Sequence, residues 1–380
     1  WWNHPPMYME KGLYRPYCKM VKDVVDVPVL CAGRMDNPDM AVQAVQNGEC
    51  DMISLGRPLL ADPDYVNKLR AGRIKEIRPC ISCQEGCMGR VQEYSMINCA
   101  VNPQAARERV TAYTPVLKPK KVMIVGGGVA GCEAARVLAI RGHKPEIFEK
   151  EQVLGGNLLP GGAPEFKEDD LELAKWYTYQ MELLGVPDHY GTKVNKEDVL
   201  AQHYDTVIIA TGSVPKRFSL GDDEKVYTAA EVLMKEKDCG KTTVIVGGGL
   251  VGCETALWLA RHGKNVTIVE ALDQLMAVNG PLCHANHDML LRLLPFHGVK
   301  EVLNGRVQSY MDGILTVDQN GTEQKLACDS VILSVGYREE NQLYKELQFE
   351  TPEIYLLGDV KNVSNIMYGI WDAFEVANHI

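Results

Sequence analysis

Two short apolar runs lie near the start of the chain, at 27–31 and 50–55, and residues 38–47 between them carry apolar side chains at helical spacing. A short apolar run is typical of a buried strand, whereas apolar positions three and four residues apart form one face of a helix. Pro38 stands near the start of the helical pattern, where proline is tolerated. The pattern therefore predicts a strand, a helix and a second strand in succession.

From residue 121 onward the pattern repeats itself. Residues 121–150 and 243–270 each consist of an apolar strand, a glycine-rich turn, an apolar helix and a second strand. Matching positions are separated by one offset, since 247 minus 126 and 270 minus 149 both give 121. This self-similarity predicts two related folding units, one after the other. Residues 321–380 return to strands and end in a helix-like segment, so we expect them to resume the first unit.

These patterns predict an α/β fold built from five stretches of the chain. A linker rich in proline and lysine at 111–120 separates the N-terminal part from the repeated units. The five stretches are a strand–helix–strand segment at 1–75, a cysteine-rich segment at 76–110, the first part of the first repeated unit at 111–235, the second repeated unit at 236–320 and the return of the first unit at 321–380.

Length and composition narrow the classes of function. A chain of 380 residues is long enough for two or three domains. Its hydrophobic share of 46% and charged share of 24% are ordinary for a globular protein, and no apolar run has the length of a membrane span. The net charge of -10 argues against general nucleic-acid binding, which needs a basic surface. We therefore expect small-molecule chemistry, with neither a nucleic-acid nor a membrane partner.

Cysteine content and the first residues bear on the setting of the protein. The chain holds twelve cysteines, but secreted domains that depend on disulfides are far smaller than this chain. A reducing, cytoplasmic setting is therefore expected. The sequence begins with Trp1 and Trp2, and it shows neither an initiator methionine nor a signal-peptide pattern. We interpret it as a piece cut at its N-terminus.

Each repeated unit contains a G-x-G-x-x-G turn between its first strand and its helix, and a glutamate at the end of its next strand. The first glycine permits a tight turn, the second lets the backbone approach a pyrophosphate, the third allows close helix packing, and the acid can accept hydrogen bonds from a ribose. Each unit is therefore predicted to bind a dinucleotide. The residues concerned are Gly126, Gly128, Gly131 and Glu149 in the first unit and Gly247, Gly249, Gly252 and Glu270 in the second.

The acid of the second unit bears on the choice of coenzyme. Glu270 would repel the 2′-phosphate of NADPH and therefore favours NADH. Arg261 and Lys264 lie nearby in the sequence and leave NADPH open. NADH is the favoured hydride donor.

Four cysteines, Cys80, Cys83, Cys87 and Cys99, follow the spacing C-x2-C-x3-C-x11-C. Isolated buried thiols do not cluster in this way, so we expect a metal centre. Four cysteines suit either structural zinc or a [4Fe-4S] cluster. The neighbouring dinucleotide unit favours iron–sulfur, because zinc cannot change its oxidation state and would be idle in an electron path.

Arg34, Gly56 and Arg57 follow the two N-terminal strands at their carboxyl ends. A β/α barrel binds phosphate in this region, in the loops after its seventh and eighth strands. Gly56 lets the backbone approach, and the two arginines can hold an anion by charge-assisted hydrogen bonds. A surface salt bridge is the alternative for either arginine alone.

Several of these segments together resemble the bacterial 2,4-dienoyl-CoA reductase and enoate reductase group, which are relatives of old yellow enzyme. The segments are Arg34 to Pro38, the run GRPLLADP at 56–63, the cysteine spacing and the paired glycine turns. The resemblance covers nearly the whole chain. It implies the C-terminal remnant of a TIM barrel at 1–75, a 4Fe-4S segment at 76–110 and two nested Rossmann-like domains, with FAD in the first unit and NAD(P)H in the second.

The resemblance also implies cofactor contacts. FMN would lie in the barrel with its phosphate near Arg34, Gly56 and Arg57, and the four cysteines would be the cluster ligands. The segments LGGN, ATG and LLGD are similar to further FAD-contacting segments of two-dinucleotide flavoproteins, although an acid after a strand is also a common turn residue. Besides its glycine turn, FAD would meet Ala130, Gly156, Asn157, Lys167, Val194, Thr211, Gly212, Gly358 and Asp359.

The sequence departs from this group in length. A whole barrel takes about 250 residues, and only its last two strands are here, so the strand edges are expected to stay open. The group's substrate-facing tyrosine and most FMN contacts belong to the part that is missing. His4 stands where relatives place an active-site histidine, and it is either a member of a proton relay or a histidine ordered by Pro5 and Pro6.

The implied activity is NAD(P)H-dependent reduction of an activated C=C bond in an unsaturated acyl-CoA, an enoate or an enone. Electrons would pass from NADH to FAD, the cluster, FMN and the substrate. A homo-oligomer is compatible with this interpretation. Three alternatives stay open: a trimethylamine-dehydrogenase-like enzyme with FMN, the cluster and bound ADP, a flavoprotein of the glutamate synthase small-subunit type, and a zinc-stabilised nucleotide-binding module without redox function.

Overall fold

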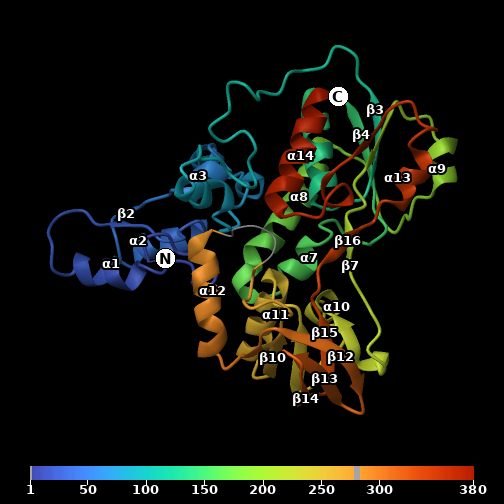
Figure 1. Cartoon of the computed structure of the whole chain (residues 1–380). Coiled ribbons are helices and arrows are strands. Elements are labelled where there is room, and N and C mark those ends of the chain that lie inside the picture. The colour runs from blue at the N-terminus through green and yellow to red at the C-terminus, as the bar shows by residue number, and fades with distance from the viewer. Residues whose placement is uncertain (1, 278–282) are drawn as a thin grey trace.

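The computed structural model describes residues 2–277 and 283–380, so Trp1 lies outside the described part of the chain. Figure 1 shows three bodies: an N-terminal unit in blue at one side, a first unit in green and red above, and a second unit in yellow and orange below. The cysteine segment, residues 76–110, lies between the N-terminal unit and the first unit. Among the described residues, no helix combines the length and the apolar character that crossing a membrane requires.

The N-terminal unit packs helices against a pair of short parallel strands. Leu30 is paired with Met52 and Cys31 with Ile53. The predicted strand, helix and strand are confirmed, and Asn37 caps the helix by accepting a hydrogen bond from the Met40 amide. The elements are α1 (Arg15–Lys22), β1 (Leu30–Cys31), α2 (Pro38–Gln46), β2 (Met52–Ile53), α3 (Arg57–Ala61) and α4 (Tyr65–Arg70).

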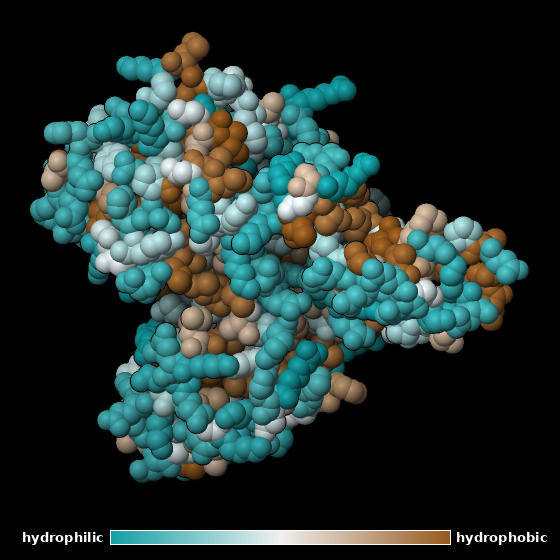
Figure 2. All heavy atoms as spheres, turned by 180° about the vertical axis from the view of Figure 1, so that it is seen from behind, coloured by the Kyte–Doolittle hydropathy of each residue, from teal (hydrophilic) through white to brown (hydrophobic). Residues whose placement is uncertain are grey.

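Apolar side chains of this unit remain exposed. Leu30 in β1 is 56% exposed and Met52 in β2 is 45% exposed, and Val24 and Val27 just before β1 are exposed as well. Figure 2 shows this apolar surface on the projecting N-terminal unit. We call these four residues the open strand edge.

The cysteine segment has little regular structure. A 3-10 turn at Ile74–Glu76 leads into it. The segment itself contains a π-helical turn at Glu85–Gly89 and the short helix α5 (Arg90–Gln92). The linker predicted at 111–120 contains neither helix nor strand.

A parallel sheet in the order β17-β6-β3-β4-β5 forms the centre of the first unit. Its central strand is buried on both faces, which explains the apolar run at 122–125. Helices α6 and α14 pack against each other on the sheet. The elements are β3 (Lys121–Val125), α6 (Val129–Arg141), β4 (Lys144–Phe148), α7 (Leu158–Gly161), α8 (Glu168–Leu184), β5 (Asp188–His189), α9 (Lys196–Ala201), β6 (Thr206–Ile209), α13 (Gln342–Leu347), β17 (Ile354–Leu356) and α14 (Ile366–His379).

The second unit repeats this plan and adds an antiparallel sheet in the order β12-β13-β14. Its parallel sheet has the order β11-β10-β9-β15-β8. The elements are β8 (Val226–Thr228), α10 (Ala229–Leu233), β9 (Thr242–Val246), α11 (Leu250–Arg261), β10 (Asn265–Val269), α12 (His284–Phe296), β11 (Lys300–Val302), β12 (Gly305–Met311), β13 (Ile314–Gln319), β14 (Thr322–Ala327) and β15 (Ser330–Leu333). The strands β7 (Ser213–Pro215) and β16 (Tyr337–Glu339) pair antiparallel where the chain passes between the two units.

The strands that pair in the sheet of the second unit include residues on both sides of the predicted range 236–320. Strand β8 precedes this range and β15 follows it, yet β15 pairs with both β8 and β9. We therefore propose limits near 226 and 333 for this unit. The prediction followed the glycine-turn motif, whereas β8 and β15 join the sheet through long-range pairing that leaves no local signal.

Candidate functional site

One cavity of about 2470 Å³ takes in both glycine turns. Strands β3 and β9 end at it, because Val125 and Val246 and the glycines that follow them are in its wall. The crevice beyond the carboxyl ends of parallel strands is where doubly wound folds bind their ligands. The repeated units therefore face each other across a common binding space.

The glycines of the first turn are required by close contacts. A Cβ on Gly126, whose φ is 110°, would come within 2.3 Å of the Ala210 carbonyl oxygen. A Cβ on Gly131 would come within 2.0 Å of the Gly126 oxygen. No atom lies within 4 Å of the Cβ position at Gly128, which precedes α6, so a ligand can approach the backbone there.

The second turn has nearly the same geometry. Gly247 has a φ of 104°, and its Cβ would lie 2.4 Å from the Ser334 oxygen. A Cβ on Gly252 would lie 2.0 Å from the Gly247 oxygen, while the space at Gly249 is open. The predicted repeat is therefore confirmed at atomic detail.

The two acids occupy equivalent positions. Glu149 is buried and accepts hydrogen bonds from the Gly127 amide at 2.6 Å and from the Glu151 amide at 2.8 Å. Glu270 accepts from the Gly248 amide at 2.6 Å and from the Leu272 amide. Backbone amides thus fix each carboxylate beside its turn, where a ribose could reach the remaining lone pairs.

Substituting the first glycine of each turn should separate the two binding events. We expect Gly126→Ala to lower FAD content at least tenfold, because the new methyl group collides with the Ala210 carbonyl. Gly247→Ala should leave FAD in place and weaken NADH binding to a similar degree. Gly185→Ala is the control, since Gly185 has a φ of 63° but no atom within 4 Å of its Cβ position. Flavin absorbance and NADH titration measure both effects, and equal losses in all three variants would contradict the assignment.

Most of the other predicted dinucleotide contacts lie in the same wall. Gly131 and Gly252 are behind it, where they allow α6 and α11 to pack closely on their strands. The predicted residues that line the cavity are Gly126, Gly128, Ala130, Glu149, Gly156, Asn157, Lys167, Val194, Thr211, Gly212, Gly247, Gly249, Glu270, Gly358 and Asp359.

Asp359 is held by a hydrogen-bond chain at the cavity wall. Its carboxylate accepts from the Ser213 hydroxyl at 2.8 Å and from the Ser364 amide at 3.0 Å. Asn157 in turn donates to the Ser213 hydroxyl at 3.4 Å. Three segments that are distant in the sequence are therefore fixed together at this point.

A buried polar cluster that the sequence analysis missed lies around Lys167. The Lys167 ammonium lies 3.0 Å from a carboxylate oxygen of Glu254 and 3.4 Å from one of Asp170. The Tyr8 hydroxyl donates to the other oxygen of Glu254 at 2.9 Å. All four line the cavity and come from the N-terminal unit, the first unit and the second unit. One available signal was Glu254 itself, an acid within the apolar helix of the second repeat.

Asp170 should make stability depend on pH. Burial raises the pKa of its carboxyl from 3.8 to about 6. The charge of Lys167 opposes this rise, but Lys167 also pairs with Glu254. The folded state then binds a proton more tightly than the unfolded state, so this stabilisation is present below pH 4 and is lost as pH rises through 6. We expect the free energy of unfolding of the wild type, relative to Asp170→Asn, to fall by up to about 3 kcal/mol over that interval. Urea unfolding of both proteins between pH 4.5 and 7.5 measures this difference, and parallel curves would contradict it.

The four predicted cysteines come together at a second, much smaller cavity. Its volume is about 20 Å³, and Cys80, Cys83, Cys87 and Cys99 all line it. Arg57 is in the same lining. The structure therefore brings the predicted ligands to one place and sets a phosphate-site candidate beside them.

Burial raises the pKa of these thiols. The pKa of Cys80 is raised to about 12 and that of Cys99 to about 11, with burial as the first cause in both. For Cys83 the charges of the other three cysteines add to the effect of burial. Thiolates at this place need a compensating cation, as a metal centre would provide.

The loop at 82–84 is held by one hydrogen bond from each of three units. Its serine hydroxyl donates to Asp169 of α8 at 3.1 Å. Its cysteine carbonyl accepts from Asn286 of α12 at 2.7 Å. Its glutamine donates to the His4 carbonyl at 2.9 Å. The serine and the glutamine have φ values of 53° and 62°, a strained conformation that these outside contacts maintain.

The arginines predicted to hold phosphate are partly engaged with protein groups. Arg34 donates to the carbonyls of Met7 and Met9 and pairs with Asp169 at 2.8 Å. Arg57 donates to the Pro5 carbonyl at 2.9 Å. Arg34 Nε and Arg57 Nη1 are buried, and neither has a hydrogen-bond partner within residues 2–277 and 283–380.

The other two residues predicted near the flavin chemistry are exposed. Gly56 immediately precedes α3, and no atom of the described residues lies within 4 Å of its Cβ position. His4 lies at the surface, where partial burial and the charge of Arg57 lower the pKa of its imidazole. The proton-relay role of His4 stays a prediction.

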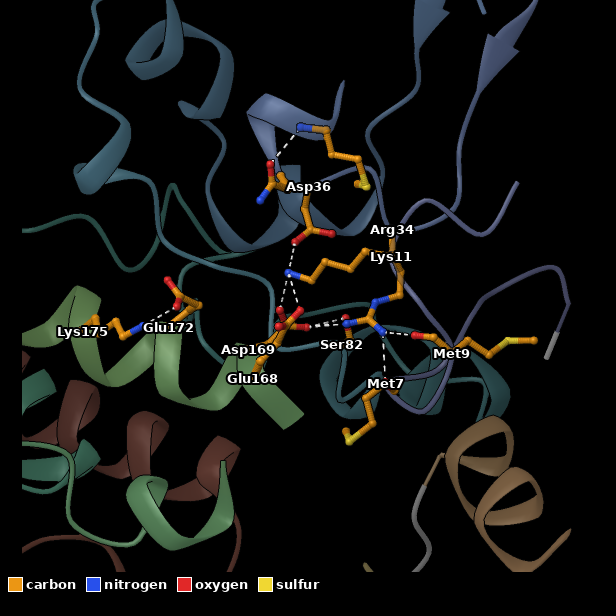
Figure 3. Close-up of polar contacts among 12 residues, drawn as sticks. Met7, Met9, Lys11, Arg34, Asp36, Ser82, Glu168, Asp169, Glu172 and Lys175 are labelled. Atoms are coloured by element: carbon orange, nitrogen blue, oxygen red, sulfur yellow. Dashed lines mark hydrogen bonds and ion pairs between the residues drawn. The ribbon is translucent and has the colours of Figure 1, made fainter. Parts of the chain in front are cut away.

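Asp169 is the centre of a buried ion network that joins the units (Figure 3). One of its carboxylate oxygens lies 2.8 Å from the Arg34 guanidinium, and the other lies 2.6 Å from the Lys11 ammonium. Lys11 also pairs with Asp36 at 3.0 Å. The side chains of Arg34 and Asp169 are each only 4% exposed. These residues lie far apart in the sequence, so no local pattern connects them.

Family comparisons match most of the chain. The model described as pyridine nucleotide-disulphide oxidoreductase matches residues 120–373. The model described as NADH:flavin oxidoreductase / NADH oxidase family matches residues 4–76. The first match covers the two repeated units, and the second covers the N-terminal unit.

Two curated relatives and one solved structure match nearly the full chain. Cinnamate reductase of Clostridium sporogenes is 48% identical over 380 residues, which are 100% of this chain and 57% of that protein. Metal reductase of Desulforamulus reducens is 33% identical and covers 99% of this chain and 60% of that protein. The structure of 2-naphthoyl-CoA reductase with 2-naphthoyl-CoA has a TM-score of 0.92 and 27% identity, and covers 99% of this chain and 57% of that chain. The chain therefore spans less than two thirds of the length of each.

These findings confirm the predicted fold class, with its barrel remnant and two nested Rossmann-like units. They also confirm the resemblance to the dienoyl-CoA and enoate reductase group.

Proposed function

The chain belongs to the pyridine nucleotide-disulphide oxidoreductase family, and on that premise we propose that it carries the NAD(P)H-oxidising half of a flavin and iron–sulfur reductase of activated C=C bonds. The observation that carries this proposal is the one cavity that takes in both glycine turns and also reaches Cys83. Two dinucleotides bound on the turns would meet in this space beside a metal centre.

The two turns fit FAD and a nicotinamide dinucleotide. The open backbone at Gly128 and Gly249 gives a pyrophosphate access to the N-termini of α6 and α11. Glu149 and Glu270 would hold the riboses. When bound, these cofactors with the cluster and FMN supply hydride and single-electron transfer from NADH to the substrate. The protein binds and orients these cofactors and encloses the two dinucleotides in the cavity.

We favour a 4Fe-4S cluster over zinc at the four cysteines. Among residues 2–277 and 283–380, no three His, Cys, Asp or Glu side chains are grouped to hold one metal ion. A tetrahedral zinc site needs four ligands at about 2.3 Å from a single ion. Four thiols that line one cavity without being grouped around a single ion fit a centre with several iron atoms better.

FMN fits the N-terminal unit in one respect. Among the described residues, Arg34 Nε and Arg57 Nη1 are buried donors without a partner, and each is suited to a phosphate oxygen such as those of FMN. The pairing of Arg34 with Asp169 leaves its Nε as the group available for this purpose.

NADH is the proposed donor because Glu270 is fixed beside its turn by backbone amides. The substrate is proposed to be a small unsaturated molecule, namely an enoate, an enone or an unsaturated acyl-CoA. The similarity to cinnamate reductase and to 2-naphthoyl-CoA reductase supports this class. A cytoplasmic location is part of the proposal, because secreted domains that depend on disulfides are far smaller than this chain.

A diaphorase assay tests the proposal. The chain, loaded anaerobically with FAD and the cluster, should oxidise NADH with an artificial electron acceptor and should bleach its flavin absorbance with NADH alone. Absence of NADH oxidation by a chain that contains flavin and iron would contradict the proposal. Metal analysis that finds zinc in place of iron would support the non-redox module, and extraction of ADP in place of FAD would support the amine-dehydrogenase alternative.

A further inference from the structure

Asn286 lies at the junction between the shared cavity and the cysteine segment. It is in the first turn of α12, in the second unit, and only 3% of it is exposed. Its side-chain Nδ2 donates a 2.7 Å hydrogen bond to the carbonyl of Cys83. This bond identifies the other side-chain atom as the oxygen, because the carbonyl can only accept.

The oxygen at the other end of this amide, Oδ1, is buried and has no hydrogen-bond partner among the residues that the structure describes. Asn286 nevertheless lines the large cavity that contains both glycine turns. Buried polar atoms nearly always have a partner, and an unpaired one lowers stability unless a ligand or another group satisfies it. The acceptor is therefore suited to a donor that enters the cavity.

The position of Asn286 limits which part of a dinucleotide could supply this donor. The ribose ends are assigned to Glu149 and Glu270, and the pyrophosphates to the glycine turns. Cys83 and Asn286 line the same cavity as the turns. Because electrons have to pass from a redox-active ring to the cysteine segment, the ring end is the part of a dinucleotide that we expect beside them. Both rings carry N–H donors, in the carboxamide of nicotinamide and in the imide of flavin.

We propose that Asn286 is a binding residue for the ring end of a dinucleotide, through an N–H···Oδ1 hydrogen bond, and that the same side chain joins that ring to the backbone of Cys83. The inference rests on the proposed function. It adds a contact that neither the glycine motifs nor the cysteine spacing contains. It also gives the second unit a direct link to the cysteine segment.

Two substitutions at Asn286 test the roles of its side-chain donor and acceptor separately. Asn286→Leu keeps the size and removes both the donor and the acceptor. Asn286→Asp keeps an acceptor toward the cavity, and when ionised it has no donor for the Cys83 carbonyl. Asn102→Leu is the matched control, because Asn102 is also buried and donates to a carbonyl, that of Leu60, but does not line the cavity.

The measurements use the full chain loaded with FAD and the iron–sulfur cluster under anaerobic conditions. The dissociation constant of FAD is measured by flavin fluorescence, and that of the nonreducing analogue 1,4,5,6-tetrahydro-NADH by titration. The electron paramagnetic resonance spectrum and the midpoint potential of the reduced cluster report on the link to Cys83.

Asn286→Leu should raise the dissociation constant of one of the two dinucleotides about tenfold. The dinucleotide affected identifies the hydrogen-bond donor as flavin or nicotinamide. At pH 8, the dissociation constants of both dinucleotides in Asn286→Asp should lie within about threefold of the wild-type values. Asn286→Leu and Asn286→Asp both lose the donor to the Cys83 carbonyl, so both should change the electron paramagnetic resonance spectrum of the cluster. Asn102→Leu should leave both dissociation constants unchanged. If Asn286→Leu does not fold, Asn286→Ser takes its place with the same expectation.

Wild-type affinity for both dinucleotides in Asn286→Leu or Asn286→Ser would overturn the binding role. An unaltered cluster signal in Asn286→Asp would overturn the link to Cys83. Failure of the wild type itself to bind FAD and the NADH analogue would instead count against the proposed function, so the two failures are distinguishable.

Discussion

Replacing Asp169 with asparagine is expected to lower the free energy of unfolding by about 3 kcal/mol. Asparagine preserves the shape of the side chain but leaves the buried Arg34 guanidinium without its charge partner, while Lys11 keeps Asp36 and the more distant Glu168. An uncompensated buried charge is far more costly than a lost surface pair. Urea unfolding followed by circular dichroism gives the stability, and hydrogen exchange of α8 and residues 7–11 locates the loss.

The same helix offers a matched control. Glu172 pairs with Lys175 at 2.7 Å, but both side chains are more than half exposed, and Figure 3 shows them on α8 away from the network. Glu172→Gln should therefore change the unfolding free energy by less than about 0.5 kcal/mol. Equal effects of the two substitutions would mean that the Asp169 network contributes no more than a solvated ion pair.

Substituting Cys83 with serine should abolish the iron–sulfur centre. Serine is nearly the same size, but its hydroxyl is a poor substitute for a thiolate as an iron ligand, so iron and acid-labile sulfide should fall at least fivefold. Transfer of electrons from NADH to the cluster should disappear with them, while FAD should remain bound on the first turn. Iron and sulfide analysis, with electron paramagnetic resonance of the dithionite-reduced protein, measures the loss.

Cys18→Ser is the control for a general effect of losing a thiol. Cys18 lies in α1 of the N-terminal unit, and its thiol has a long contact of 3.9 Å with the Leu30 carbonyl. Iron content should be unchanged in this variant. Full iron content in Cys83→Ser would exclude Cys83 from the ligand set and would leave the cavity at the four cysteines without its proposed occupant.

Local sequence patterns predicted the parts of the site that depend on local structure. The third glycine of each turn, Gly131 or Gly252, is needed because the first glycine of the same turn leaves no room for a Cβ, so the motif can be recognised from a few neighbouring residues. Glu149 and Glu270 follow at a fixed distance along the same units. The cysteine spacing likewise reflects one short segment that folds around a small cavity.

Residues that act across units had no such local pattern. Tyr8 and Glu254 are 246 positions apart, and Cys83 and Asn286 are 203 apart. Asp169 and Asp170 stand in an acidic stretch at the start of α8, which resembles an ordinary solvated helix start. Only tertiary packing buries these carboxylates, and the boundaries of the second unit depended on long-range pairing in the same way.

The open strand edge has a practical consequence for handling the protein. Leu30 and Met52 belong to a sheet of two strands, with no further neighbour in the described part of the chain, and Val24 and Val27 add apolar surface. Unpaired strand edges with apolar side chains attract other copies of the same chain. We expect light scattering of concentrated solutions to rise with time, and a lysine in place of Leu30 to prolong the interval before turbidity appears.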